Sequence, residues 1–141
     1  MTDNLTRDQR SYCMSRVKGK DTVPEVVLRS ALHRRGHRFR KHVRTLPGKP
    51  DIVFPRQRLV VFVDGGFWHG YRFPQWKDRL APFWRDKINA NRLRDRRNLR
   101  QLRLEGWTVI RVWQHQIERS LDWVITRIED AIHRPCDKIH L

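Results

Sequence analysis

The sequence has few acidic residues, few cysteines and no long apolar run. Only 15 aspartates and glutamates stand against 31 lysines and arginines, so the formal net charge of the 141 residues is +16. No apolar run approaches the roughly 20 residues that span a bilayer, and the polar N-terminus does not resemble a signal peptide. The two cysteines, Cys13 and Cys136, lie far apart, which argues against a disulfide scaffold or a cysteine zinc cage. We therefore expect a cytoplasmic protein with reduced thiols.

The excess of basic residues indicates a polyanionic partner. A charge this large creates a strongly positive field, and nucleic acid is the first partner to consider, ahead of acidic membranes and ribosomal RNA. Charge alone does not distinguish an enzyme from a basic binding module. The hydrophobic content of 38% and the six tryptophans indicate a folded chain, because a disordered basic tail is poor in both.

The hydrophobic pattern predicts an α/β protein with the element order α-β-β-β-α-β-α. We expect residues 1–20 to form a basic N-terminal arm and residues 21–141 to form a single domain. The expected elements are a helix over 22–36, an edge strand within 37–45, a hairpin of strands 51–54 and 59–63, an irregular aromatic loop over 67–84, a helix over 85–105, a strand over 107–113 and a helix over 121–133.

Four polar side chains fall where they could form a catalytic cluster. Asp51 begins the first hairpin strand and Asp64 follows the second, and a hairpin of this length places Asp51 beside the end of the second strand. Carboxylates and a nearby backbone carbonyl are hard oxygen ligands for Mg²⁺. Glu25 could lean in from the first helix, and His69 is of a type that suits a general base.

Each of these residues also has a plainer interpretation. Asp51 and Asp64 could be turn residues, Glu25 could compensate the helix dipole at the surface, and His69 could be a solvated side chain. Their combination in a chain of +16 favours phosphodiester hydrolysis, in which a metal ion neutralises the growing charge and activates water.

The aromatic loop and the basic helix allow two interpretations each. Phe67 and Trp68 are either core residues or wedges that unstack a base step at a cost of about a few kcal/mol. The basic run over 92–97 is either a solvated helix face or a phosphate-binding surface. Asp95, within this run, could face the active site or pair with a neighbouring arginine.

Five motifs, taken in order, resemble the very short patch repair (Vsr) endonucleases. They are Leu46-Pro-Gly-Lys-Pro-Asp51, Val61-Phe-Val-Asp-Gly-Gly-Phe-Trp-His69, Phe83-Trp-Arg-Asp-Lys-Ile88, Asp95-Arg-Arg-Asn and Gly106-Trp-Thr-Val-Ile-Arg-Val-Trp113. The resemblance implies a restriction-endonuclease-like PD-(D/E)xK core with a mixed sheet flanked by helices. It also implies a Mg²⁺-dependent endonuclease that nicks duplex DNA at T:G mismatches.

The resemblance also implies roles for single residues. Asp51 matches the metal-binding aspartate, Val63 the residue whose backbone carbonyl binds Mg²⁺, and Glu25 an acid that supports the site. His69 matches the histidine that acts on the water. Asp64 stands where family members usually carry a histidine, and an acid there could bind the metal. The residues expected to contact DNA are Phe67, Trp68 and Trp84 as intercalating aromatics, and Lys87, Arg92, Arg96 and Arg97 as phosphate contacts.

The family also has a structural zinc, which this chain is expected to lack. The corresponding positions read Gly66, Tyr71, Phe73 and His115, whereas a tetrahedral zinc site needs four Cys or His ligands. Packing of Tyr71, Phe73 and Trp76 is expected to replace the zinc.

The expected partner is double-stranded, mismatched DNA, bound by a monomer that works with DNA repair proteins. Two alternatives remain open from the sequence. One is a Vsr-like restriction or defence nuclease without mismatch specificity, and the other is a non-catalytic basic DNA-binding module.

Overall fold

A computed structural model describes residues 22–65 and 70–134 and contains a four-stranded sheet in the order β1-β2-β3-β4. Strands β1 and β2, and β2 and β3, pair antiparallel, whereas β3 and β4 pair parallel. The strands are β1 (Arg40–Lys41), β2 (Ile52–Phe54), β3 (Leu59–Asp64) and β4 (Thr108–Trp113). The sheet is therefore mixed, and the predicted α/β class with a restriction-endonuclease-like core is confirmed.

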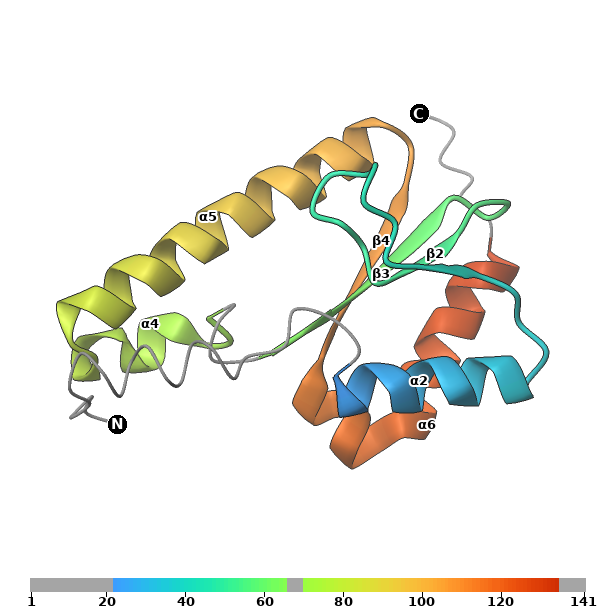
Figure 1. Ribbon diagram of the computed structural model, residues 1–141, viewed down its shortest axis with the longest axis horizontal. Coiled ribbons are helices and arrows are strands. Elements are labelled where there is room, and N and C mark those ends of the chain that lie inside the picture. The colour runs from blue at the N-terminus through green and yellow to red at the C-terminus, as the bar shows by residue number, and fades with distance from the viewer. Residues whose placement is uncertain (1–21, 66–69, 135–141) are drawn as a thin grey trace.

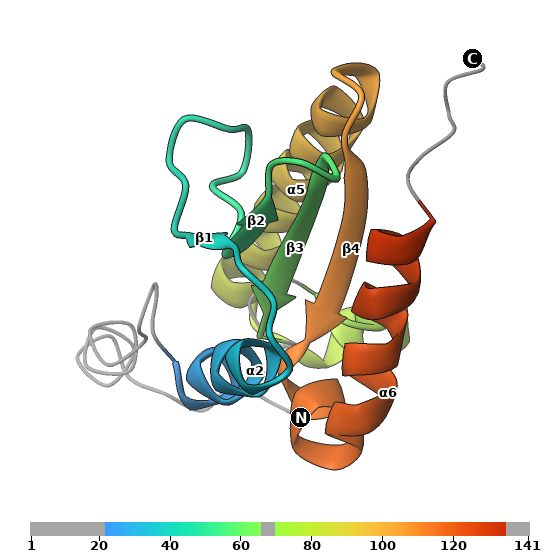
Figure 2. The same ribbon diagram turned by 90° about the vertical axis from the view of Figure 1, so that its right-hand side faces the viewer.

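Helices cover both faces of this sheet (Figures 1 and 2). The helical elements are α2 (Val23–Arg34), α4 (Phe73–Trp76), the 3-10 helix η1 (Lys77–Arg79), α5 (Pro82–Leu104) and α6 (Gln114–His133). Helices α2 and α6 lie together on one face, and the long helix α5 crosses the other (Figure 2). Helix α5 also carries the chain from β3 to the parallel strand β4, a connection that parallel strands require.

The central strand β3 supplies core residues to both faces. Side chains alternate along a strand, so Val61 and Val63 pack in the cluster with α2 and α6, while Val60 and Phe62 pack with Leu102 of α5. All six residues of β3 are buried. The buried central strand that the continuous apolar run predicted is confirmed.

The segment predicted as an irregular loop over 67–84 contains two short helical elements. Phe73 and Leu80 pack with Trp84 and Ile88 in a separate apolar cluster, and this packing orders α4 and η1. Helix α5 begins at Pro82, three residues before the predicted start, because proline fits the first turn of a helix.

Two other predicted boundaries were wrong. Helix α6 begins at Gln114 instead of residue 121, because non-helical dihedrals at Ser120 (φ −147°, ψ 56°) split it into two parts and the apolar stripe of the sequence marks only the second. The predicted edge strand over 37–45 is reduced to two residues, because the backbone turns at His42, where φ is 53°.

Some predictions lie outside the described residues. These are the N-terminal arm over 1–20 and the side chains of Phe67, Trp68 and His69. None of the helices between residues 22 and 134 combines the length and apolar character needed to cross a membrane.

Glu129 of α6 binds residues that follow the C-terminal end of α2 and so connects the two helices. Its carboxylate accepts hydrogen bonds at 2.7 and 2.8 Å from Arg35, and His37 Nε2 lies 2.7 Å from Oε2. The bonds from Arg35, followed by the contact with His37, lower the pKa of Glu129 to about 2. We expect Glu129→Gln to lower the free energy of unfolding by about 1 kcal/mol at neutral pH, a small value because Arg35 is largely exposed.

The sign of the pH dependence follows from the lowered pKa of Glu129. Its stabilisation is complete above the unfolded-state pKa of about 4.5 and is lost as pH falls toward 2. Urea denaturation of wild type and variant at pH 7 and at pH 3 measures this. A difference in stability between wild type and variant that stays constant between the two pH values would contradict it.

Candidate active site

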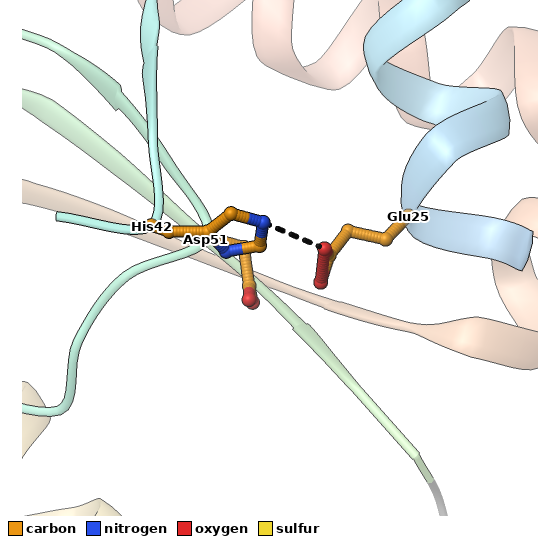
Figure 3. Close-up of side chains that lie close together, drawn as sticks. All are labelled: Glu25, His42 and Asp51. Atoms are coloured by element: carbon orange, nitrogen blue, oxygen red, sulfur yellow. Dashed lines mark ion pairs between the residues drawn. The ribbon is translucent and has the colours of Figure 1, made fainter. Parts of the chain in front are cut away.

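Glu25, His42 and Asp51 bring one ligand atom each to within 4.8 Å of one another. Figure 3 shows the three side chains converging from α2, from the turn after β1 and from the start of β2. His42 Nε2 lies 3.6 Å from Glu25 Oε2. Two carboxylates and an imidazole are ligands that divalent first-row metals accept, and no other described residues form a group of three such side chains at this spacing.

The first turn of α2 positions Glu25. Pro24 sits in this turn, and the Thr22 hydroxyl accepts a hydrogen bond from the Glu25 N–H at 3.4 Å, as an N-cap does. The Glu25 side chain is buried, and Arg29, one turn later, donates to its Oε2 at 2.8 Å. A buried carboxylate without compensation would be costly, and Arg29 provides a compensating charge for Glu25.

The hairpin of β2 and β3 positions Asp51. The Val63 N–H donates to Asp51 Oδ2 at 2.6 Å, and the Asp51 N–H donates to the Val61 carbonyl at 3.1 Å. The prediction that the hairpin places Asp51 beside the end of the second strand is therefore confirmed.

His42 is a candidate site residue that sequence reasoning missed. The β1–β2 ladder pairs Lys41 with Ile52, so the residue that follows β1 lies opposite Asp51. The His42 N–H donates to the Asp51 carbonyl at 3.1 Å. In the sequence, His42 is one polar residue in a basic run. Only the strand register marks it, and no local pattern in a single sequence reveals that register.

The surroundings of Asp51 favour its protonated form when no cation is bound. The pKa of Asp51 is raised to about 8, mainly by burial and also by the nearby Glu25 and Asp64 carboxylates, while the hydrogen bond from Val63 opposes the change. A cation at this cluster would replace that proton and supply the charge compensation that the protein leaves incomplete.

Asp64 is held by an arginine on the neighbouring strand. Arg111 of β4 donates from Nε to Asp64 Oδ2 and from Nη2 to Asp95 Oδ2, each at 2.7 Å. Asp95 was expected either to face the active site or to pair with a neighbouring arginine, and it pairs with an arginine 16 residues away. Asp64 is not a member of the Glu25, His42 and Asp51 group.

The expected DNA-contacting aromatics are only partly described. Trp84, expected to intercalate, is 3% exposed and packs against Phe73 and Ile88, so its indole does not reach the surface in this conformation. Its neighbour Phe83 is 45% exposed and stacks edge-on against it, with ring centroids 5.0 Å apart. The amphipathic helix α5 explains the difference, because adjacent residues point to different sides of a helix.

The positions that match the family's zinc ligands carry an aromatic contact. The Tyr71 ring lies edge-on to His115 at 4.5 Å and to Trp113 at 5.0 Å. Trp76 Nε1 donates to the Tyr71 carbonyl at 2.8 Å, and the Trp76 ring packs on Phe73. The expected packing of these three aromatics therefore joins the loop to the end of β4. The absence of zinc stays a prediction.

The expected phosphate contacts all lie on α5. Arg96 and Arg97 are exposed, and Lys87 and Arg92 are half-buried.

A separate pocket of about 720 Å³ lies at the other end of β2, where Phe39, Phe54 and Ile132 line it. It does not include the residues of the metal-ligand group.

Comparison with known proteins agrees with this geometry. The family model described as DNA mismatch endonuclease Vsr matches residues 2–75. The chain is 50% identical over 119 residues to the type II nicking enzyme V.XorIIP of Xanthomonas oryzae pv. oryzae, covering 83% of this chain and 88% of the relative. It is 37% identical over 133 residues to the type II nicking enzyme V.NmeDIP of Neisseria meningitidis serogroup C, covering 92% and 90%.

A further relative carries the family's own name. The chain is 36% identical over 138 residues to the DNA mismatch endonuclease Vsr of Escherichia coli, covering 94% of this chain and 88% of the relative. The matches extend well beyond the five motifs, through the sheet and both helical layers. The chain belongs to the Vsr family and is a DNA endonuclease.

Proposed function

We propose that the chain nicks one strand of duplex DNA at T:G mismatches and that Asp51 binds the Mg²⁺ ion required for the cut. The observation that carries this proposal is the convergence of Glu25, His42 and Asp51 beside the end of β3. The names of the family and of its Escherichia coli member, DNA mismatch endonuclease, support the choice of substrate.

The donor chemistry of the site fits a divalent cation. Asp51 and Glu25 supply carboxylate oxygens, and the backbone carbonyl of Val63 is the further oxygen ligand that we propose. His42 adds a nitrogen ligand, which would widen the choice of metal beyond Mg²⁺, toward Mn²⁺. The ion would neutralise the charge that develops on the phosphate and lower the pKa of bound water.

The remaining residues have supporting roles in this proposal. His69, which lies outside the described residues, would accept a proton from the attacking water. Arg29 holds the Glu25 carboxylate in place through its 2.8 Å bond. Asp64, held by Arg111, contributes negative charge near Asp51, and we propose that it acts on the metal electrostatically.

Mismatch selection would come from the aromatic segment. We propose that Phe67 and Trp68 enter the base stack where a mispair weakens it, since unstacking a defective step costs less. Trp84 would hold this segment from the core, with the exposed Phe83 beside it at the surface. We further propose that residues 21–141 act as one domain and as a monomer, with the arm over 1–20 gripping the DNA.

A second candidate function has its own support. Relatives from Xanthomonas and Neisseria are named type II nicking enzymes, without mention of a mismatch. A nicking nuclease of a restriction or defence system would keep the same metal site and lose the mismatch requirement. Membership in an endonuclease family argues against the third alternative, a non-catalytic binding module.

A nicking assay separates the two functions. Matched and T:G-mismatched duplexes of the same sequence are incubated with Mg²⁺, Mn²⁺ or EDTA, with each strand labelled separately. We expect metal-dependent cleavage of one strand of the mismatched duplex only. Equal cleavage of the matched duplex would keep the nuclease and reject mismatch selection, and cleavage that persists in EDTA would reject the metal site.

A further inference from the structure

A second pocket lies on the α5 face of the sheet, next to Asp64. Its volume is about 300 Å³, and its polar lining consists of four arginines, Arg72, Arg92, Arg96 and Arg111, with Leu99, Trp113 and Gly70 completing the wall. The lining contains no acidic side chain. Arg111 joins this pocket to the active site, because it also binds Asp64.

Packing holds three of these guanidinium groups in place. Arg111 stacks 4.4 Å over the Trp113 ring, Arg92 lies 5.2 Å over Phe73 and Arg72 lies 5.2 Å over Tyr71. The stem of Arg92 also runs against Gly70, so closely that a Cβ at Gly70, where φ is +72°, would lie 2.5 Å from Arg92 Cδ. Arginines fixed in this way lose little side-chain entropy when they bind a ligand.

The charge balance of the pocket favours an anion. Asp64 and Asp95 both bind Arg111, so two carboxylates face four guanidinium groups. The remaining positive charge faces a small, partly enclosed space in which attraction is stronger than in bulk water. Planar guanidinium groups match the oxygens of a phosphate in pairs, and the volume accommodates one phosphate with part of a nucleotide.

The position of the pocket indicates which phosphate this would be. Val63 donates to Asp51 at 2.6 Å, and the next residue, Asp64, which ends β3, binds Arg111 of the pocket at 2.7 Å. The metal-ligand group and the pocket therefore share the carboxyl end of β3. A DNA strand whose scissile phosphate lies at Asp51 therefore passes close to the arginines.

We propose that Arg72, Arg92, Arg96 and Arg111 form a binding site for one backbone phosphate of the cleaved strand, next to the scissile phosphate. This inference rests on the proposed function for the location of the scissile bond. The site fixes the register of the strand on the metal-ligand group, which phosphate contacts do without reading sequence.

The first test uses two exposed arginines and a matched control. Arg72→Ala and Arg96→Ala remove pocket charges, whereas Arg100→Ala removes an exposed charge one turn along α5 from Arg96 and outside the pocket. Binding of a labelled duplex to the full chain is measured in EDTA between 50 and 200 mM salt. We expect each pocket variant to bind about 10-fold more weakly and the slope of log affinity against log salt to fall by about 1.

The second test locates the phosphate on the DNA. A set of duplexes carries one uncharged methylphosphonate linkage at each position around the scissile bond. At one position next to the scissile bond, we expect the uncharged linkage to weaken DNA binding by wild type and by Arg100→Ala. Arg96→Ala already lacks this contact, so the same linkage should not weaken its binding further. The proposal would be overturned, even if nicking is normal, by either of two results. One is that the effects of Arg96→Ala and of the uncharged linkage on affinity add at every position, and the other is that Arg96→Ala and wild type have the same salt slope.

Inorganic phosphate distinguishes the two sources of the anion. We expect millimolar phosphate to compete with DNA no better than sulfate at equal ionic strength. If free phosphate binds tightly and methylphosphonate substitution does not change DNA affinity, the pocket is a small-anion site, which contradicts the proposal. If the wild type does not nick DNA, but the pocket variants in EDTA still show the expected changes in affinity and salt dependence, only the proposed function is rejected.

Discussion

Asp51→Asn is expected to abolish nicking and, at the same time, to stabilise the metal-free protein at alkaline pH. Cleavage should fall at least 10³-fold, because a neutral amide is a poor metal ligand and a loss of about 4 kcal/mol of transition-state stabilisation corresponds to that factor. The fold should survive, since the amide oxygen can still accept the 2.6 Å hydrogen bond from the Val63 N–H.

The stabilisation follows from the raised pKa of Asp51. In the folded protein this pKa is about 8, against 3.8 for the free group, so folding favours the protonated carboxyl. The stability contributed by that proton is complete below pH 4 and is lost as pH rises through 8. Asparagine resembles the neutral form at every pH and shows no such loss.

Urea denaturation in EDTA between pH 5 and pH 9 measures this effect. One pKa unit corresponds to about 1.4 kcal/mol, and a carboxylate that keeps part of its hydration retains only part of the full shift. We therefore expect the variant to exceed wild type by on the order of 2 kcal/mol at pH 9 and by much less at pH 5. The control is Asp78→Asn at an exposed aspartate, for which no such trend is expected. A variant that is less stable than wild type at pH 9 would contradict the burial of this carboxyl.

Arg111→Met is expected to lower the free energy of unfolding by about 2 kcal/mol. Asp64 and Asp95 keep 12% and 16% of their side-chain surface exposed, so removal of the arginine takes its positive charge away from two largely desolvated carboxylates. Breaking a buried ion pair on one side costs more than the pair contributes, because the remaining charge loses its compensation but stays desolvated. Methionine preserves most of the side-chain volume over Trp113.

A double-mutant cycle tests whether the cost comes from the carboxylates that lose the charge of Arg111. Asp64→Asn in the Arg111→Met background should recover about half of the lost stability, which would show as a coupling of about 1 kcal/mol. Arg119→Met, at an exposed position of α6, is the control and should leave stability within about 0.5 kcal/mol of wild type. Purely additive effects of Arg111→Met and Asp64→Asn would show that the bridge does not carry the stability of this end of the sheet.

The bridge also compensates the acid at position 64, where the family resemblance implies a histidine. A free carboxylate at the end of β3 would repel the DNA backbone and raise the pKa of Asp51 further. Arg111 supplies the compensating charge from the parallel neighbour, since Asp64 pairs with Trp113 in the β3–β4 ladder and Arg111 lies two residues before it.

The sequence by itself determined the class of the fold and the position of Asp51. The continuous, β-branched apolar run before Asp64 indicates a buried strand, and a four-residue connection favours its pairing with the strand that follows Asp51. Helix α2 and the end of helix α5 were predictable because proline, periodic apolar residues and glycine mark them locally, whereas α5 begins three residues before its predicted start. These features depend on residues close together in the chain.

Only the tertiary structure decided which side chains meet. His42 joins Asp51 through the β1–β2 register, Arg111 joins Asp64 and Asp95 across three elements, and Trp84 is buried by a cluster that forms when α4 folds back on α5. Each of these contacts depends on strand register or helix packing, which the whole core selects together. A single sequence records the residues that form such contacts but not their pairing, because no local pattern links residues that the chain brings together from a distance.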